Sequence, residues 1–222
     1  GNPKGVMLSH GNMMSNVEGI SKLITFDQTE KFLSFLPLSH SFERMGGHFT
    51  AFSVGAQVYY AESIETVPDN LQEVKPSVVL SVPRLYEKMY ARVREGLKLA
   101  PEARQKIFWW AINIGKKATE YRLKNQSLPF SLGLKHKIAD KLVYSKVKDR
   151  VGGNLRFFVS GGAPLSKEIA EFFAAADVTI LEGYGLSETS PVLTVNSPEN
   201  IRFGSVGKPL FNVDLKIAED GE

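Results

Sequence analysis

Residues 182–191 read EGYGLSETSP, a glycine-rich stretch that ends with a carboxylate between two hydroxyls. Glu188 is acceptor-only when ionised, which suits Mg²⁺, and the hydroxyls of Ser187 and Thr189 can donate to phosphate oxygens. Tyr184 offers a flat face for a purine. The alternative is an ordinary turn between two strands, and this stretch alone does not decide between them.

Two other glycine-rich loops have similar potential. Residues 160–166 read SGGAPLS and follow a predicted strand, so Gly161 and Gly162 would let a flat ring approach the backbone at the end of that strand. The alternative is a strand-to-helix turn capped by Ser166. Residues 1–5 read GNPKG, which could place backbone amides and a lysine on a polyphosphate, but the spacing GxxxxGK[ST] is absent. Alone, this loop reads more readily as a turn with a solvated lysine.

The histidines add one candidate. His40, in FLPLSHSFER, directly follows a predicted strand and could line the same crevice, although a lone histidine beside an apolar strand is more often a hydrogen-bonded core residue. His10, in LSHGN, is expected to cap local structure. His40 and His48 lack a matching third ligand, and the chain has no cysteine, so we expect no zinc site.

The elements that must position these residues alternate between strand and helix. Short apolar runs rich in Val, Ile and Phe predict buried strands at 32–36, 57–60, 77–82, 155–160 and 178–181. Helices of crossover length are predicted between them at 43–54, 64–74 and 167–176. This alternation predicts an α/β fold with a mostly parallel sheet flanked by helices on both faces.

Two regions depart from the alternation. The segment of about 84–150 contains three helical stretches and predicts a helical insertion. Residues 81–156, which contain it, hold 18 Lys or Arg and only 6 Asp or Glu. This charge indicates an anionic partner, or else helices whose lysines are simply solvated. After residue 185, PVLTV at 191–195 and NVDLKI at 212–217 predict strands, so we expect a β-rich subdomain to begin at 186–222.

Composition sets further limits. No apolar run approaches the roughly 18 residues needed to cross a bilayer, so the sequence does not predict a membrane-spanning protein. The absence of cysteine fits a reducing compartment, and we expect a cytoplasmic protein, with peripheral contact to the inner face of an anionic membrane as a further expectation. The chain starts without Met and ends on a predicted strand and turn, which suggests a piece of a longer protein.

Taken in order, five blocks of sequence resemble the adenylate-forming superfamily, which includes acyl-CoA synthetases, luciferases and peptide-synthetase adenylation domains. The blocks are GNPKGV with LSHGN, LPLSHSFER, SGGAPLS, EGYGLSETSP and GSVGKPL, and they span nearly the whole chain. Within the superfamily, VPRLYEKMYARV and the long basic insertion look most like a long-chain fatty-acyl-CoA synthetase. The chain would be the central part of the large domain, with an N-terminal region and a C-terminal domain missing.

The resemblance implies an ATP-dependent, AMP-forming ligase. A fatty acid carboxylate attacks the α-phosphate of ATP, pyrophosphate leaves, and the thiol of coenzyme A then attacks the acyl-adenylate. The substrates would be a fatty acid and CoA, with Mg²⁺ on the phosphates. No enzyme nucleophile is needed, because the protein positions the substrates and neutralises phosphate charge. By itself, this fragment is expected to be inactive.

The resemblance also implies a role for each matching residue. Lys4 and Gly5 would belong to the phosphate loop. Gly161, Gly162 and Ala163 would form the adenine-binding turn, and the stretch Glu182, Gly183, Tyr184 and Gly185 would line the adenine and acyl pocket, with Tyr184 on the purine. Ser187, where many relatives have Thr, would contact phosphate, Glu188 would hold Mg²⁺, and His40 would close on the acyl carboxylate and α-phosphate.

Several alternatives stay open. The substrate could be an aryl, medium-chain or amino acid, or the chain could be a relative that binds a nucleotide or a membrane without catalysis. No nucleic-acid-binding motif appears, so nucleic acid is not expected as a partner. The sequence leaves acyl length and oligomeric state open.

Overall fold

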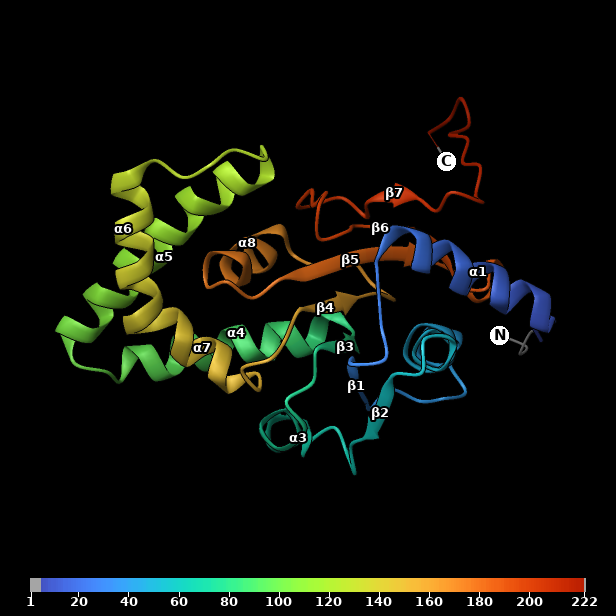
Figure 1. Ribbon diagram of the computed structural model, residues 1–222, viewed down its shortest axis with the longest axis horizontal. Helices are drawn as coiled ribbons and strands as arrows, with labels where there is room; N and C mark the ends of the chain where they lie inside the picture. Colours follow the sequence, from blue (N-terminus) through green and yellow to red (C-terminus); the bar gives the residue numbers. More distant parts are fainter. Residues whose placement is uncertain (1–4, 222) are drawn as a thin grey trace.

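The computed structural model describes residues 5–221. In this part of the chain, a mixed β-sheet lies at the centre of the molecule, between layers of helices (Figure 1). Its order is β2-β1-β3-β4-β5-β6-β7. The pairs from β2 across to β5 are parallel, and β6 and β7 add to β5 in antiparallel fashion. The strands are β1 (Lys31–Ser34), β2 (Gln57–Tyr60), β3 (Val78–Ser81), β4 (Phe157–Ser160), β5 (Ile180–Gly185), β6 (Val192–Val195) and β7 (Lys208–Pro209). The predicted mostly parallel sheet is confirmed.

Helices cover both faces of this sheet, as predicted. Buried side chains of α3 (Val67–Val74), α4 (Pro83–Lys98), α5 (Glu102–Leu123) and α8 (Lys167–Ala175) pack on one face. The other face is covered by α1 (His10–Leu23), the π-helix η1 (Glu43–Phe49) and α2 (Thr50–Ser53). Successive strand residues point to opposite faces. Val79 and Phe158 therefore join the first layer, whereas Phe32, Leu80 and Phe157 join the second.

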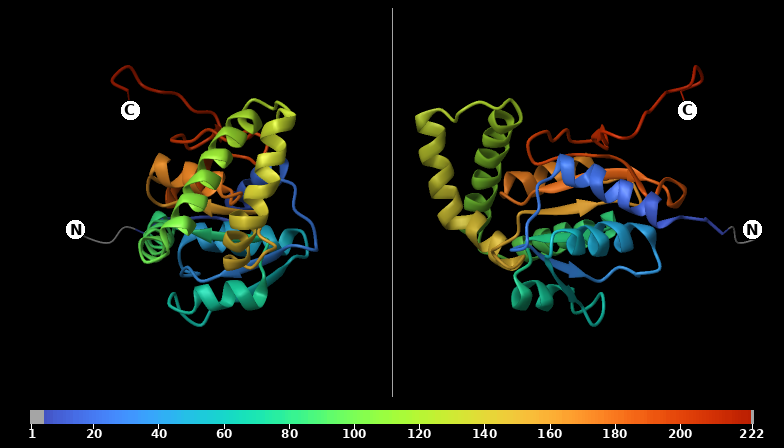
Figure 2. Two further views of the ribbon diagram at one scale, coloured as in Figure 1. Left: turned by 90° about the vertical axis from the view of Figure 1, so that its left-hand side faces the viewer. Right: turned by 45° about the vertical axis from the view of Figure 1, so that its right-hand side comes forward.

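The predicted helical insertion is present as α4, α5, α6 (Phe130–Ala139), the π-helix η2 (Asp140–Tyr144) and α7 (Ser145–Arg150). Helices α5 and α6 stand out from the sheet, at the opposite end of the molecule from both ends of the described chain (Figures 1 and 2). The fully buried Tyr144 ties η2, which continues α6, to α5, because its hydroxyl donates to the Ala111 carbonyl. None of the helices within residues 5–221 has the length and hydropathy needed to cross a membrane.

Three local predictions are wrong. NVDLKI is not a strand: although its apolar residues alternate, no strand of the described chain pairs with it, and Leu215 and Ile217 stay exposed. The short strand β7 forms earlier instead, in a stretch for which no strand was predicted. The glycine-rich stretch after Leu181 was expected to be a loop, but its first four residues continue β5 to Gly185. They do so because β6 lies beside them and pairs with them.

Helix α1 was not predicted. It begins with a capping box, in which the Ser9 hydroxyl accepts from the Asn12 amide at 3.1 Å and the Asn12 side chain accepts from the Ser9 amide at 2.9 Å. Ser9 therefore caps this helix. His10, which was expected to cap local structure, is instead the first residue of the helix. The signal was present in the sequence SHGN. Ser166, considered as a cap for α8, holds the N-cap position without a side-chain capping bond.

Candidate functional site

The candidate site forms where the parallel strands end. His40 follows β1, Gly161 and Gly162 follow β4, and Ser187 follows β5. Because parallel strands place their carboxyl ends at one edge, these loops meet beside a single pocket of about 340 Å³. The pocket wall includes these predicted site residues: His40, Gly161, Gly162, Gly183, Tyr184, Gly185, Ser187 and Glu188.

The rest of the pocket wall is mainly apolar. It is contributed by α1, η1, the sheet and the loops beside them: Ile20, Ile24, Phe26, Phe32, Phe42, Met45, Val78, Leu80, Val159, Leu186, Pro191, Val192 and Val195. Ile24, Phe32 and Val78 are buried, whereas His40 and Glu188 are exposed and Tyr184 is half-exposed. The pocket therefore has a polar side that opens to solvent and an apolar interior.

The polar side has defined hydrogen-bonding geometry. The ring nitrogen Nδ1 of His40 accepts from the Phe42 amide at 3.2 Å. In the neutral imidazole this bond leaves the proton on Nε2, so the ring can donate to an oxygen in the pocket. The hydroxyls of Ser41 and Ser187 lie 3.3 Å apart and connect the loop after β1 to the loop after β5.

Glu188 has the surroundings of a carboxylate that could hold a cation. It is exposed on the 3₁₀ turn η3 (Ser187–Thr189), and no side chain of residues 5–221 pairs with it. The described part of the chain has no cluster of three acidic, His or Cys residues that could hold a metal alone. Mg²⁺ does not require one, since it commonly binds through one or two carboxylates, substrate phosphates and water. Glu188 therefore fits a magnesium that arrives with a polyphosphate.

Thr189 is placed differently from Ser187. Its hydroxyl oxygen accepts from the Leu186 amide at 2.9 Å, and its hydroxyl proton faces the carbonyls of Leu186 and Pro191. The side chain thus holds the turn that presents Ser187 and Glu188, and it does not line the pocket.

Glu182 is also outside the pocket wall, although its neighbours line it. Its buried carboxylate accepts from the Leu165 amide at 3.1 Å and so ties β5 to the loop that follows β4. Ala163, in that same loop, is exposed and does not line the pocket. Gly5 lies exposed in coil away from the wall, and Lys4 is outside the described residues.

Two of the glycines have a clear structural requirement. Gly162 has φ of +80°, which disfavours any residue with a side chain. A Cβ on Gly185 would lie 1.8 Å from the Pro191 carbonyl oxygen, so only glycine lets β6 approach this closely. The glycines are thus needed to build the pocket wall, whatever the pocket binds.

A second hollow of about 430 Å³ adjoins the first and shares His40, Ser41 and Ser187 with it. It adds the exposed side chains of Arg44 and His10 and the segment that begins at Val6. The Arg44 guanidinium is held by a 3.0 Å bond from Nε to the Leu38 carbonyl. A cation, imidazoles and hydroxyls in one hollow suit an anion such as phosphate.

The comparison with protein families agrees with this chemistry. All 222 residues match the model of one family, described as AMP-binding enzyme. The chain belongs to this family.

Several members of the AMP-binding family are similar along nearly the whole chain. A putative fatty-acid–CoA ligase of Mycobacterium tuberculosis is 36% identical over 100% of this chain and 39% of its own length. The human long-chain-fatty-acid–CoA ligase ACSBG2 is 37% identical over 95% of this chain and 32% of its own length. The peroxisomal long chain acyl-CoA synthetase 6 of Arabidopsis thaliana is 35% identical over 99% of this chain and 30% of its own length. The chain therefore spans between 30 and 39% of these relatives.

Solved structures support the same fold. The o-succinylbenzoate coenzyme A synthetase MenE of Bacillus subtilis, in complex with ATP and magnesium, covers the whole chain with a TM-score of 0.64 at 18% identity. The apo form of MatB from Rhodopseudomonas palustris covers 95% of the chain with a TM-score of 0.62 at 21% identity. This chain matches about a third of each.

Within this AMP-binding chain, two important residues were missed by the sequence analysis. Glu43 of η1 is only 1% exposed, and its Oε2 has no hydrogen-bond partner among residues 5–221. Burial raises the pKa of Glu43 to about 7, and a hydrogen bond with Ser34 offsets part of the rise. Asn16 of α1 is buried and bonds both backbone groups of Val192. Nothing in their local sequence marks either side chain as buried.

Proposed function

We propose that this chain is the central part of a longer, ATP-dependent, AMP-forming ligase that activates a long-chain fatty acid and transfers it to coenzyme A. The observation that carries the proposal is the pocket itself. Its exposed side has the groups that suit a nucleotide, and its buried interior has the apolar wall that suits an alkyl chain. The names of the relatives, which are fatty-acid–CoA ligases and acyl-CoA synthetases, support the same substrate class.

The polar side would bind ATP and Mg²⁺. The backbone at Gly161 and Gly162 and the face of Tyr184 would receive the adenine ring, and Ser187 would donate to a phosphate oxygen. Glu188 would hold Mg²⁺, which supplies neutralisation of phosphate charge when bound. Arg44 and His10 in the adjoining hollow would face the outer phosphates. Lys4 and Gly5 remain proposed parts of the phosphate loop, and Thr189, Glu182 and Ala163 would act by shaping the surrounding turns.

The apolar interior would hold the fatty acid with its carboxylate toward His40. The carboxylate oxygen then attacks the α-phosphorus, the bond to pyrophosphate breaks, and an acyl-adenylate forms. The proton on His40 Nε2 can bond the carboxylate or the α-phosphate during this step. The thiol of coenzyme A would next attack the acyl carbonyl, and AMP would leave. Each buried methylene stabilises binding by about 0.8 kcal/mol, so an apolar pocket favours longer acids until it is full.

Two further features belong to the proposal. Residues 1–185 would be the central part of the large domain, and 186–222 would begin a β-rich subdomain, although β6 and β7 also extend the main sheet from β5. Peripheral contact with an anionic membrane would bring the enzyme to fatty acids that partition there.

The test is ATP–pyrophosphate exchange by the full-length protein, with straight-chain acids of increasing length. We expect exchange to peak with long acids. Glu188→Gln should lower exchange by roughly 10²–10³-fold, because it removes a charge that helps to stabilise the transition state. Glu199→Gln is the matched control, since Glu199 is an exposed acid outside both hollows.

Three outcomes would contradict all or part of the proposal. If the protein binds ATP but exchanges pyrophosphate with no carboxylic acid, it is a nucleotide-binding relative without catalysis. If exchange requires an aryl or amino acid, the ligase chemistry holds and the fatty acid substrate is wrong. Equal activity of Glu188→Gln and the control would remove Glu188 from the magnesium site.

A further inference from the structure

Helix α6 and the following π-helix carry an exposed apolar stripe. Phe130 is 90% exposed, Leu134 54%, Ile138 46% and Leu142 42%. These residues recur every fourth position, which places them along one side of the helical segment. Such a row of large apolar side chains in water indicates a surface that meets a partner.

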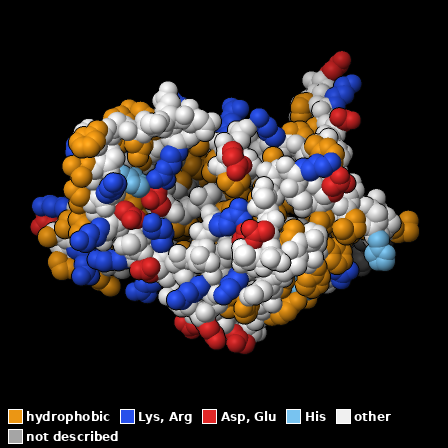
Figure 3. Space-filling view, viewed as in Figure 1, with side chains coloured by type: hydrophobic (Ala, Val, Ile, Leu, Met, Phe, Trp, Pro, Cys, Tyr) orange, Lys and Arg blue, Asp and Glu red, His pale blue; other side chains and the backbone are white. Residues whose placement is uncertain are grey.

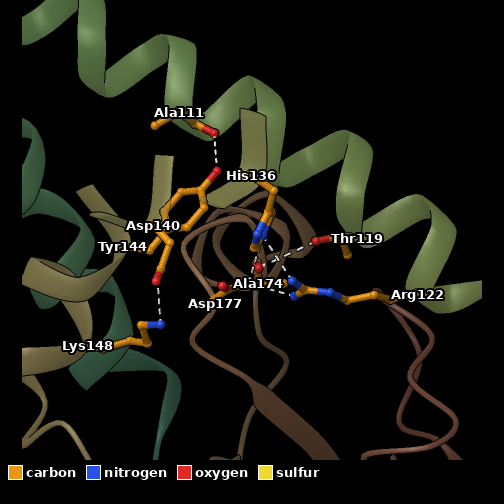
Figure 4. A network of polar contacts seen from close by, with 9 residues as sticks. All are labelled: Ala111, Thr119, Arg122, His136, Asp140, Tyr144, Lys148, Ala174 and Asp177. Atoms are coloured by element: carbon orange, nitrogen blue, oxygen red, sulfur yellow. Dashed lines mark hydrogen bonds and ion pairs between the residues drawn. The ribbon is translucent and has the colours of Figure 1, made fainter. Parts of the chain in front are cut away.

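The opposite side of α6 is anchored to the rest of the molecule (Figure 4). Ala139 and Tyr144 are fully buried. His136 bonds Arg122 of α5 at 3.0 Å and lies 3.5 Å from the Asp177 carboxylate, to which Arg122 donates at 2.6 Å. The helix therefore cannot turn its stripe inward without breaking this network, and the stripe is held facing outward.

Lysines accompany the stripe. Lys135, Lys137 and Lys141 are exposed, and none of them has an ion-pair partner within residues 5–221. Figure 3 shows hydrophobic side chains along the outer edge of the molecule over α6, with Lys and Arg side chains beside them. An apolar row bordered by unpaired cations has the pattern of a helix that lies in the surface of an anionic bilayer.

We propose that α6 with η2 is the docking surface of this protein on an anionic lipid membrane. The stripe would insert between lipid chains, and the three lysines would contact the lipid phosphates. A second copy of the chain fits less well, because two-fold pairing through this stripe would bring like-charged lysines together. Both ends of the described chain lie at the opposite end of the molecule from α6 (Figures 1 and 2).

This proposal rests on the proposed function only for the choice of a lipid partner. Its test requires no ATP and no acid, so a failure here is separable from a failure of the ligase assignment. The full-length protein is sedimented with vesicles of phosphatidylcholine alone and with vesicles that also contain phosphatidylglycerol. We expect binding to the mixed vesicles that weakens as salt is added.

Two triple variants test the surface. The first replaces Phe130, Leu134 and Ile138 by Ser, and the second replaces Lys135, Lys137 and Lys141 by Gln. Each should lower the partition constant by at least about tenfold, since both the apolar and the cationic contributions are needed. All six side chains are exposed, so the fold should be retained, which circular dichroism and thermal unfolding check.

The controls match the variants in kind and differ in place. Ile64→Ser removes an apolar side chain that is 55% exposed in the loop before α3, and the triple change of Lys22, Lys208 and Lys216 to Gln removes the same charge far from α6. Both should bind vesicles like the unchanged protein. Wild-type protein that binds neither vesicle, or a stripe variant that binds normally, overturns the proposal. A stripe variant that loses self-association, with vesicle binding unchanged, assigns the surface to a second copy instead.

Discussion

At the scale of single residues, Glu43 combines features that are costly for a protein to keep. Its carboxyl is buried on the π-helix that supplies Met45 and Gly46 to the pocket wall, and one of its oxygens has no hydrogen-bond partner in the described part of the chain. The nearby Gly47 has no room for a side chain, because a Cβ there would lie 2.4 Å from Glu43 Oε1. A neutral carboxyl fits this site much better than a charged one.

This burial predicts a pH dependence of stability. The pKa of Glu43 is about 7 in the folded protein against 4.5 as the ordinary value, so its contribution is fully present below pH 4.5 and is lost as pH rises toward 7. Glu43→Gln, which cannot ionise, should therefore be more stable than the unchanged protein above pH 7, by up to about 3 kcal/mol, and lose this advantage near pH 4.5.

Urea unfolding at a series of pH values measures this effect. Glu18→Gln, an exposed residue paired with Lys22, is the control and should show no such crossover. A constant difference between Glu43→Gln and the unchanged protein at every pH would show that Glu43 does not titrate in this way.

At the scale of elements, the amide side chain of Asn16 adds two hydrogen bonds to the apolar packing of α1 on the sheet. Asn16 Nδ2 donates to the Val192 carbonyl at 2.7 Å, and the Val192 amide donates to Asn16 Oδ1 at 3.0 Å. These bonds link α1 to β6 across 176 positions of sequence. Since Ile20 of α1 and Ile24, the residue directly after the helix, line the pocket, this clamp also positions one side of it.

Removing the clamp should destabilise the protein. Asn16→Ala leaves the buried amide and carbonyl of Val192 without partners, which should cost about 2–4 kcal/mol. Asn113→Ala, on the exposed side of α5, should change the free energy of unfolding by about 0.5 kcal/mol or less. Chemical unfolding measures both. A loss for Asn16→Ala no larger than that of Asn113→Ala would show that the clamp contributes little.

At the scale of the whole molecule, the pocket exists only because separate layers meet. Its wall draws on α1, η1, β1, β3 and the loops after β4 and β5. The size and shape of the pocket therefore depend on elements that supply only apolar side chains to its wall, and α1, which lines it through Ile20, is such an element.

Ile20→Phe tests this dependence. Ile20 is 9% exposed and lines the pocket from α1, so a larger side chain should shorten the space for an acyl chain. We expect exchange by the full-length protein to fall more for long acids than for short ones, by about tenfold for an acid that is too long by one or two methylenes. Ile20→Val should preserve the order of the acids. An unchanged length preference in Ile20→Phe would place the acyl chain elsewhere.

The sequence alone determined the features that depend on neighbouring residues. Apolar runs separated by amphipathic segments predicted the parallel strands, the helices on both faces and the insertion, since these signals are local. Five motif blocks predicted the family, and their positions after strands predicted that His40 would meet Gly161 and Ser187 at one edge.

The tertiary structure decided the features that depend on distant partners. A strand needs a neighbour, so β5 extended through Gly185 where β6 lies beside it, whereas NVDLKI found none in the described chain. Burial turned Glu43 into a carboxyl with a raised pKa and made Asn16 a clamp. Tertiary packing also left the apolar row of α6 in water, because the other side of this helix packs against α5. Each depends on contacts between residues far apart in the chain, which local sequence patterns do not encode.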